Sequence, residues 1–175
     1  MTTQQPIETR NLDGYGNAPL AWARVEAALE ATGKKNDTWF LGTTGADGRP
    51  HAAGVGALWH DSGLYFTSGS GTRKSKNLAR NPAASVGISL ADIDLVFEGE
   101  VERVTDRAAL EVLAGRFNEG GWPAKVEGDA FTAPFSAPSA GPPPWQVYRF
   151  RFAKVYAVAS SEPFGATRWT FEGAE

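Results

Sequence analysis

The stretch DLVFEGEVERV, Asp94–Val104, alternates apolar or small residues with charged ones. Leu95, Phe97, Gly99 and Val101 occupy one set of positions, and the acidic residues Glu98, Glu100 and Glu102 occupy the other. Because side chains of a strand point to opposite faces in turn, this period of two predicts a β-strand with one buried and one solvated face. We interpret the three glutamates as that solvated face rather than as paired catalytic acids.

Shorter segments on both sides of this stretch have the same character. Asp47-Gly48 and Asp61-Ser-Gly63 are turn sequences, and they are expected to join three antiparallel strands into a meander. The predicted strands are Thr38–Thr44, His51–His60, Leu64–Thr67, Ala84–Leu90, Asp94–Val104, Trp145–Ala159 and Thr167–Phe171.

Three segments have helical patterns instead. One begins near Pro19, has Trp22, Val25 and Leu29 at helical spacing, and is expected to end at Gly33. A short polar helix, Arg73–Arg80, ends before Asn81-Pro82, and an amphipathic helix covers Asp106–Asn118.

The order of these elements predicts the fold class. It is mainly β with helices: a six- to seven-stranded antiparallel barrel or sandwich with Greek-key-like connections. We expect residues 1–17 to form a polar N-terminal arm and residues 18–175 to form one domain, with a Pro-rich loop at 120–144.

Composition excludes several classes of function. The 175 residues contain no cysteine and two histidines, so thiolate chemistry is absent and no metal site is predicted. A net charge of −3 argues against general binding to nucleic acid or membranes. The polar first residues lack a signal-peptide layout, and no segment has the length of a membrane helix; we therefore expect a soluble, cytoplasmic protein.

The most informative local segment is FTSGSGTRKSKNLAR, Phe66–Arg80. Small hydroxyl residues and two glycines allow backbone N–H groups to approach a ligand closely. Four cations then fall within eight residues of an acidic protein: Arg73, Lys74, Lys76 and Arg80. Cations at a helix start cost about 0.3–1 kcal/mol each unless an anion compensates. We interpret the segment as a phosphate site; a solvated surface helix is the alternative.

Other residues provide weaker candidates. His51 and His60 are interpreted as turn or surface histidines, and no Gly-x-Ser-x-Gly sequence supports a hydrolase. Trp122, Trp145 and Trp169 flank the Pro-rich loop and the last strand, so one of them could cover a planar ligand in a substrate pocket. The sequence indicates no catalytic side chain.

Four phrases in this order resemble the pyridoxamine 5′-phosphate oxidase-like superfamily, the FMN-binding split barrels. They are the strands from Thr38 to Thr67, YFTSGSGTRKSKNLARNP, LVFEGEVERV and TRWTF, within residues 35–171. The resemblance implies a split β-barrel that works as a homodimer with cofactor sites at the interface. It places the terminal phosphate at Arg73 and Lys74, and a C-terminal arginine, here Arg168, near the flavin, often from the partner subunit. The cofactor-binding residues that it implies are Gly54, Val55, Gly56, Phe66, Thr67, Thr72, Arg73, Lys74, Asp94 and Arg168.

Two positions depart from the namesake activity. Where pyridoxamine phosphate oxidases have a substrate-binding arginine and histidine, this chain has Phe164 and Ala166, which argues against vitamin B6 oxidation. Asp94 also stands near a position where the family often has a glutamine.

Two functional hypotheses follow from the resemblance. The first is an oxidoreductase that moves a hydride between FMN, or a deazaflavin, and an apolar small molecule, with the chemistry residing in the cofactor. The second is a non-catalytic carrier or sensor that binds flavin, deazaflavin or haem on the same barrel; haem would need His51 or His60 as axial ligand. A barrel that has lost its cofactor is a third, weaker hypothesis. The sequence specifies neither the substrate nor the choice between FMN and deazaflavin.

Overall fold

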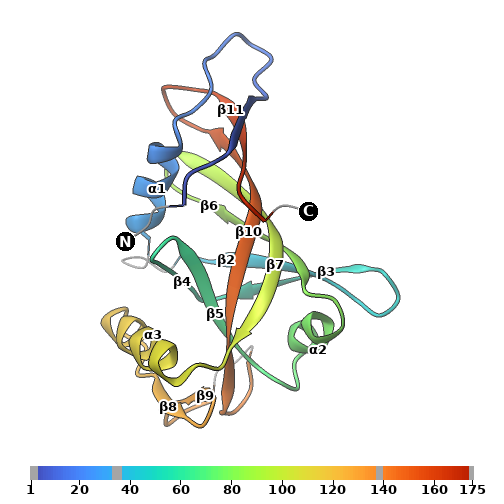
Figure 1. Ribbon diagram of the computed structural model, residues 1–175, viewed down its shortest axis with the longest axis vertical. Coiled ribbons are helices and arrows are strands. Elements are labelled where there is room, and N and C mark those ends of the chain that lie inside the picture. Colours follow the sequence, from blue (N-terminus) through green and yellow to red (C-terminus); the bar gives the residue numbers. More distant parts are fainter. Residues whose placement is uncertain (1–3, 33–36, 137–139, 174–175) are drawn as a thin grey trace.

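The computed structural model describes residues 4–32, 37–136 and 140–173, which form an antiparallel β-structure with three helices (Figure 1). The helices are α1 (Trp22–Glu30), α2 (Arg73–Arg80) and α3 (Arg107–Glu119). The strands are β1 (Glu8–Asn11), β2 (Trp39–Thr44), β3 (Pro50–Val55), β4 (Ala57–His60), β5 (Gly63–Gly69), β6 (Ala83–Ser89), β7 (Ile93–Val104), β8 (Lys125–Glu127), β9 (Ala130–Thr132), β10 (Trp145–Ala159) and β11 (Ala166–Thr170).

The strand order explains the split form of the barrel. Hydrogen-bonded neighbours run β4-β5-β10-β7-β6-β2-β3, and β3 and β4 are joined only through Gly56. The sheet is therefore not closed by hydrogen bonds at that point. The long strand β10 also pairs with β11 along Lys154–Val158, and β11 pairs with β1.

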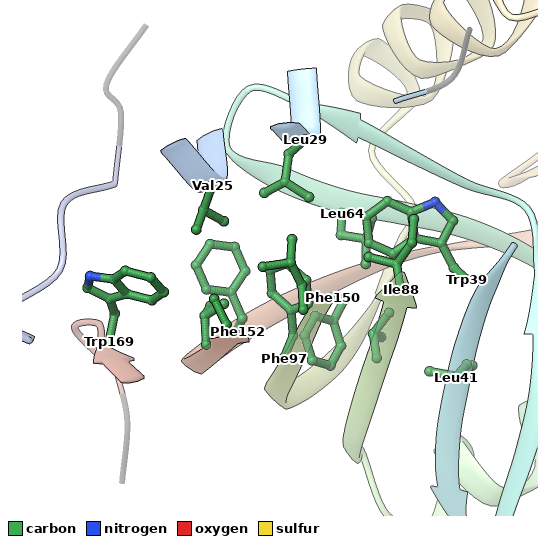
Figure 2. Packing of buried hydrophobic residues seen from close by; sticks show 14 of the residues in the cluster. Val25, Leu29, Trp39, Leu41, Leu64, Ile88, Phe97, Phe150, Phe152 and Trp169 are labelled. Atoms are coloured by element: carbon green, nitrogen blue, oxygen red, sulfur yellow. The ribbon is translucent and has the colours of Figure 1, made fainter. Parts of the chain in front are cut away.

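The alternating stretch forms β7, as its pattern predicts, and Leu95, Phe97 and Val101 are buried. Helix α1 covers one end of this core, and Figure 2 shows Val25 and Leu29 beside the aromatic side chains of β7 and β10. A second, smaller core lies between α3 and the sheet, where Leu110 and Leu113 pack with Phe131 and Val147. No helix in the described ranges has the length and apolar character needed to cross a membrane.

The structure confirms the mainly β, antiparallel split-barrel prediction but corrects its details. The predicted count of six or seven strands is too low, because the described part of the chain has an eleven-stranded sheet. The stretch His51–His60 forms two strands: β3 pairs with β2, and β4 pairs with β5. The expected three-stranded meander is therefore two hairpins, because the local alternation does not encode a change of partner at Gly56.

Two further segments differ from expectation. The Pro-rich loop at 120–144 contains the short hairpin β8–β9, and the polar arm contains β1, which pairs with β11. All four residues of β1 are exposed, so it lacks the alternation that reveals a half-buried strand. The predicted helix stop at Gly33 lies outside the described residues, as does Pro138 of the loop.

Candidate functional site

The loop between β5 and α2 is held by its own hydroxyl groups. Thr72 is the N-cap of α2, and its Oγ1 accepts a hydrogen bond from the Ser75 N–H at 3.3 Å. The same Oγ1 donates to the Gly69 carbonyl at 2.9 Å and lies 2.8 Å from Ser68 Oγ. Because a helix start leaves several N–H groups without intrahelical acceptors, this rigid loop presents donors at a defined position.

Two side chains in the first turn of α2 are buried although they are polar. Lys74 is 5% exposed and Ser75 is 4% exposed. Burial lowers the pKa of the Lys74 ammonium through desolvation, and Ser75 Oγ has no hydrogen-bond partner in the described structure. A buried hydroxyl without a partner normally costs stability. The region formed by the β5–α2 loop and the first turn of α2, called the corner below, can therefore bind a further polar group.

Arg73 points in a different direction from Lys74. Its side chain is exposed, and a Cβ added at Gly45, in the β2–β3 turn, would lie 3.7 Å from its Nη2. The guanidinium therefore lies beside the turn that carries Arg49. The other helix cations, Lys76 and Arg80, are also exposed. The cationic helix start that the sequence predicts therefore lies where three elements meet: the β5–α2 loop, α2 and the β2–β3 turn.

The Pro-rich loop contacts the same corner. A Cβ added at Gly69 would lie 2.3 Å from the Ala140 carbonyl oxygen, so the absence of a side chain there allows the two segments to touch. Trp145 Nε1 donates to the Gly141 carbonyl at 3.0 Å. The rings of Trp122 and Trp145 are 5.4 Å apart, and Phe135 beside Trp145 is 43% exposed. Two of the three predicted tryptophans, one within the loop and one directly after it, therefore lie together.

The β3–β4 bend places the next predicted residues. Gly54 and Gly56 are exposed, whereas Val55 is 8% exposed and points into the core. Thr67 is half-buried on β5. The side chain of Phe66 is fully buried and stacks on Tyr148 with ring centroids 5.2 Å apart, so it packs in the core and does not face the corner.

Three predicted residues lie elsewhere in this chain. Asp94 is exposed on β7 and accepts a hydrogen bond from Ser89 Oγ at 2.6 Å. Arg168 on β11 pairs with Glu8 at 3.4 Å, and the strands β2, β6, β7 and β10 separate it from β3. Trp169 is 1% exposed and packs against Trp22 in the main core, so the structure does not group it with the other two tryptophans.

The two histidines occupy different places. His51 is half-buried opposite Thr43, and its Nδ1 is buried without a hydrogen-bond partner. His60 is one of the residues that line a cavity of about 560 Å³ between α3 and the sheet. Within the described ranges, no cluster of three or more histidine and acidic side chains could hold a metal ion.

Sequence reasoning missed the burial of three polar residues, Ser75 and Asn77 on α2 and Thr43 on β2. Their burial depends on which strand the helix packs against, which no local pattern shows. The only available signal was the polar sequence RKSKNLAR itself, which has a single large apolar residue, Leu78, with which to hold a helix on a core.

Comparison with known protein families decides the affiliation. The family model described as pyridoxamine 5′-phosphate oxidase matches residues 25–159. The chain belongs to this family. The match includes the whole segment from β2 through α2 and β7 to the end of β10, and therefore the corner described above. Members of this fold family bind flavin-type cofactors.

Several solved structures share the fold of this chain at low sequence identity. A Clostridium acetobutylicum protein related to general stress protein 26 has a TM-score of 0.59 at 16% identity, covering 87% of this chain and 96% of its own. A Bacteroides thetaiotaomicron protein described as a putative 5-nitroimidazole antibiotic resistance protein has a TM-score of 0.56 at 15% identity, with coverages of 96% and 92%. PhzG from Burkholderia lata, solved with tetrahydrophenazine-1-carboxylic acid, has a TM-score of 0.57 at 16% identity, with coverages of 88% and 85%. No curated protein matches the sequence. At these identities the structures show the shared fold alone.

Proposed function

We propose that this member of the pyridoxamine 5′-phosphate oxidase family binds FMN or a deazaflavin by its phosphate at the start of α2. The observation that carries the proposal is the pair of buried polar groups there, the desolvated Lys74 ammonium and the partnerless Ser75 hydroxyl. A phosphate fits both groups, since it neutralises a desolvated cation and accepts hydrogen bonds from hydroxyl and backbone donors. Arg73 supplies a second cation from the exposed side.

We propose further that the protein is an oxidoreductase that moves a hydride between this cofactor and an apolar small molecule. A bound flavin or deazaflavin supplies the hydride chemistry itself. The protein's own residues bind the phosphate, orient the ring and exclude water. The loop around Phe135 and Trp145, which touches Gly69, is the proposed wall of the substrate pocket. Phe164, which is 48% exposed and lies just before β11, would reach this pocket from a second copy of the chain, as proposed below for Arg168. It offers a substrate an apolar contact where a phosphate-binding arginine would be needed for vitamin B6.

A homodimer is proposed because Arg168 lies far from α2 along the sheet of its own chain. Arg168 Nε is buried without a hydrogen-bond partner. The outer face of the sheet also carries exposed apolar side chains at Phe40, Val96 and Val158, and Phe40 and Val96 both flank Gly87 on β6. A second copy on this face would cover the apolar residues and bring its Arg168 to the cofactor.

The cofactor proposal is tested with a matched set of variants. Arg73→Ala, Lys74→Ala and Ser75→Ala are expected to weaken binding of FMN, measured by fluorescence titration, whereas Lys76→Ala on the exposed side of α2 is not. Each charge-assisted contact that is lost costs about 1.5–3 kcal/mol, or roughly 10- to 150-fold in Kd. Ser75→Ala is expected to leave thermal stability intact, because its hydroxyl has no partner to lose. The site is refuted if all four variants bind FMN as tightly as the wild-type protein does, and likewise bind a phosphorylated deazaflavin as tightly as it does.

The enzymatic proposal is tested by following oxidation of the reduced bound cofactor with apolar acceptors under anaerobic conditions. Acceleration over the free cofactor supports an oxidoreductase, while tight binding without acceleration supports the carrier hypothesis. The dimer is tested by light scattering of Phe40→Asp, with Val112→Asp on α3 as a control that is similarly exposed. Only the first substitution is expected to produce a monomer.

A further inference from the structure

Helix α2 depends on polar contacts to hold its position. It has eight residues, a length that is not stable in isolation. Its buried residues are Lys74, Ser75, Asn77 and Leu78, so a single large apolar side chain anchors it to the core. The placement of the proposed phosphate site therefore depends on hydrogen bonds between this helix and the sheet.

A chain of three hydrogen bonds crosses from α2 to β2 at one place. Arg80 Nη2 donates to Asn77 Oδ1 at 2.7 Å, and Asn77 Nδ2 donates to Thr43 Oγ1 at 3.0 Å. Thr43 Oγ1 in turn donates to the His51 carbonyl at 3.4 Å. Asn77 is 2% exposed and Thr43 is 4% exposed, so water does not compete strongly for these bonds.

The direction of this chain is fixed at both ends. A guanidinium can only donate and a backbone carbonyl can only accept. Asn77 must therefore turn its carbonyl oxygen toward Arg80 and its amide group toward Thr43. The Thr43 hydroxyl accepts from that amide and uses its own hydrogen for the His51 carbonyl. One arrangement of donors satisfies every member, which makes the contact specific for a single position of the helix.

The two ends of this contact suit a positioning role. Asn77 lies three residues after Lys74, which puts both on one face of the helix about 4.5 Å apart along its axis. Thr43 belongs to β2, which pairs with β3 on one side and with β6 on the other. A displacement of Asn77 would thus move Lys74 and Ser75, whereas β2 is restrained by both neighbouring strands.

We propose that Asn77 is a positioning residue for phosphate binding, which it performs by tying α2 to Thr43 on β2. This inference rests on the cofactor site proposed above. Asn77 does not touch the phosphate; it keeps the first turn of α2 where Lys74 and Ser75 can reach it. The consequence is a selective one: losing the chain weakens ligands that carry a phosphate and leaves affinity for the ring system alone unchanged.

The test compares FMN with riboflavin, which has the same ring but no phosphate, across substitutions at both ends of the contact. Asn77→Leu removes the chain from the helix side. Thr43→Val removes the hydroxyl at constant shape, and Thr43→Ser restores it. Titrations give the ratio of the two dissociation constants for each variant, and thermal melts establish that each variant is folded.

We expect the preference for FMN over riboflavin to fall about tenfold in Asn77→Leu and in Thr43→Val, and to be kept in Thr43→Ser. The double variant Asn77→Leu/Thr43→Val is expected to lose no more than either single variant, because both break the same contact. If Asn77→Leu fails to fold, the Thr43 pair decides the question. A wild-type preference for FMN that is unchanged in the folded variants overturns the positioning role alone. Wild-type protein that binds neither FMN nor a phosphorylated deazaflavin overturns the cofactor site and this inference together.

Discussion

Replacing Lys74 by methionine should weaken the binding of FMN and remove a pH-dependent contribution to the stability of the cofactor-free protein. Lys74 is buried at the start of α2, where its charge is desolvated and opposes the positive end of the helix dipole. Methionine has a similar unbranched shape and fills the space of the lysine stem without a charge. The substitution therefore removes the charge that a phosphate would contact while keeping the bulk of the side chain.

The same substitution removes one charge-assisted phosphate contact, so the Kd for FMN should rise about 10- to 150-fold. Fluorescence titration measures this effect. Lys76→Met, on the exposed side of the same helix, is the matched control and should bind FMN as tightly as the wild-type protein does.

The pH dependence of stability gives an independent check. Because burial lowers the pKa of Lys74, the folded state releases its proton at lower pH than the unfolded chain does. Between the folded-state pKa and the ordinary lysine pKa of about 10.4, the unfolded chain binds more protons, so stability contributed by this group rises with pH. Lys74→Met should remove that rise. A methionine variant whose stability has the same pH profile as that of the wild-type protein would refute the assignment of Lys74 as a desolvated cation.

The remaining predictions concern substitutions of glycine by alanine, at positions where a side chain would or would not meet a neighbouring backbone. Gly69→Ala places a Cβ 2.3 Å from the Ala140 carbonyl oxygen; it should cost about 1–3 kcal/mol of unfolding free energy in a denaturant titration, whereas Gly71→Ala, with no atom within 4 Å, should cost little. Gly99→Ala places a Cβ 2.0 Å from the Arg151 carbonyl oxygen beside the β10 irregularity. It should lower Tm strongly, and an unchanged Tm would contradict the close pairing of β7 and β10. Gly115→Ala in α3 is open to solvent and should instead raise stability by about 0.5–1 kcal/mol through helix propensity, as a thermal melt can show.

Local sequence patterns predicted most of the regular elements. The bounds of α2 and β10 match their predicted ranges, Arg73–Arg80 and Trp145–Ala159. Both have strong local signals: α2 is followed by Asn81-Pro82 and begins after a capping threonine, and β10 is a long aromatic-rich strand. β1, β8 and β9 escaped prediction because they are only three or four residues long and their exposure does not alternate over enough residues.

The candidate site, like the fold, could be predicted from the sequence only in part. Its cations and its loop could be recognised from the residues between Ser68 and Arg80, because charge and small hydroxyl residues are properties of a contiguous stretch. The distinction between Arg73, which is exposed, and Lys74, which is buried, could not be recognised. Which of two neighbouring cations on a short helix is buried depends on which face of the helix packs against the sheet, and the local sequence does not show that face.

The sequence by itself determined the β-rich fold class, the position of the basic helix start and the absence of a local catalytic motif. These depend on periodicity and composition, which are present along the chain before it folds. Only the tertiary structure decided that β3 and β4 pair with different strands on the two sides of Gly56, that Asn77 contacts Thr43, and that Arg168 lies apart from α2. Each of these joins residues that are distant in the sequence, and such contacts are set by how strands pair and helices pack rather than by any neighbouring residue.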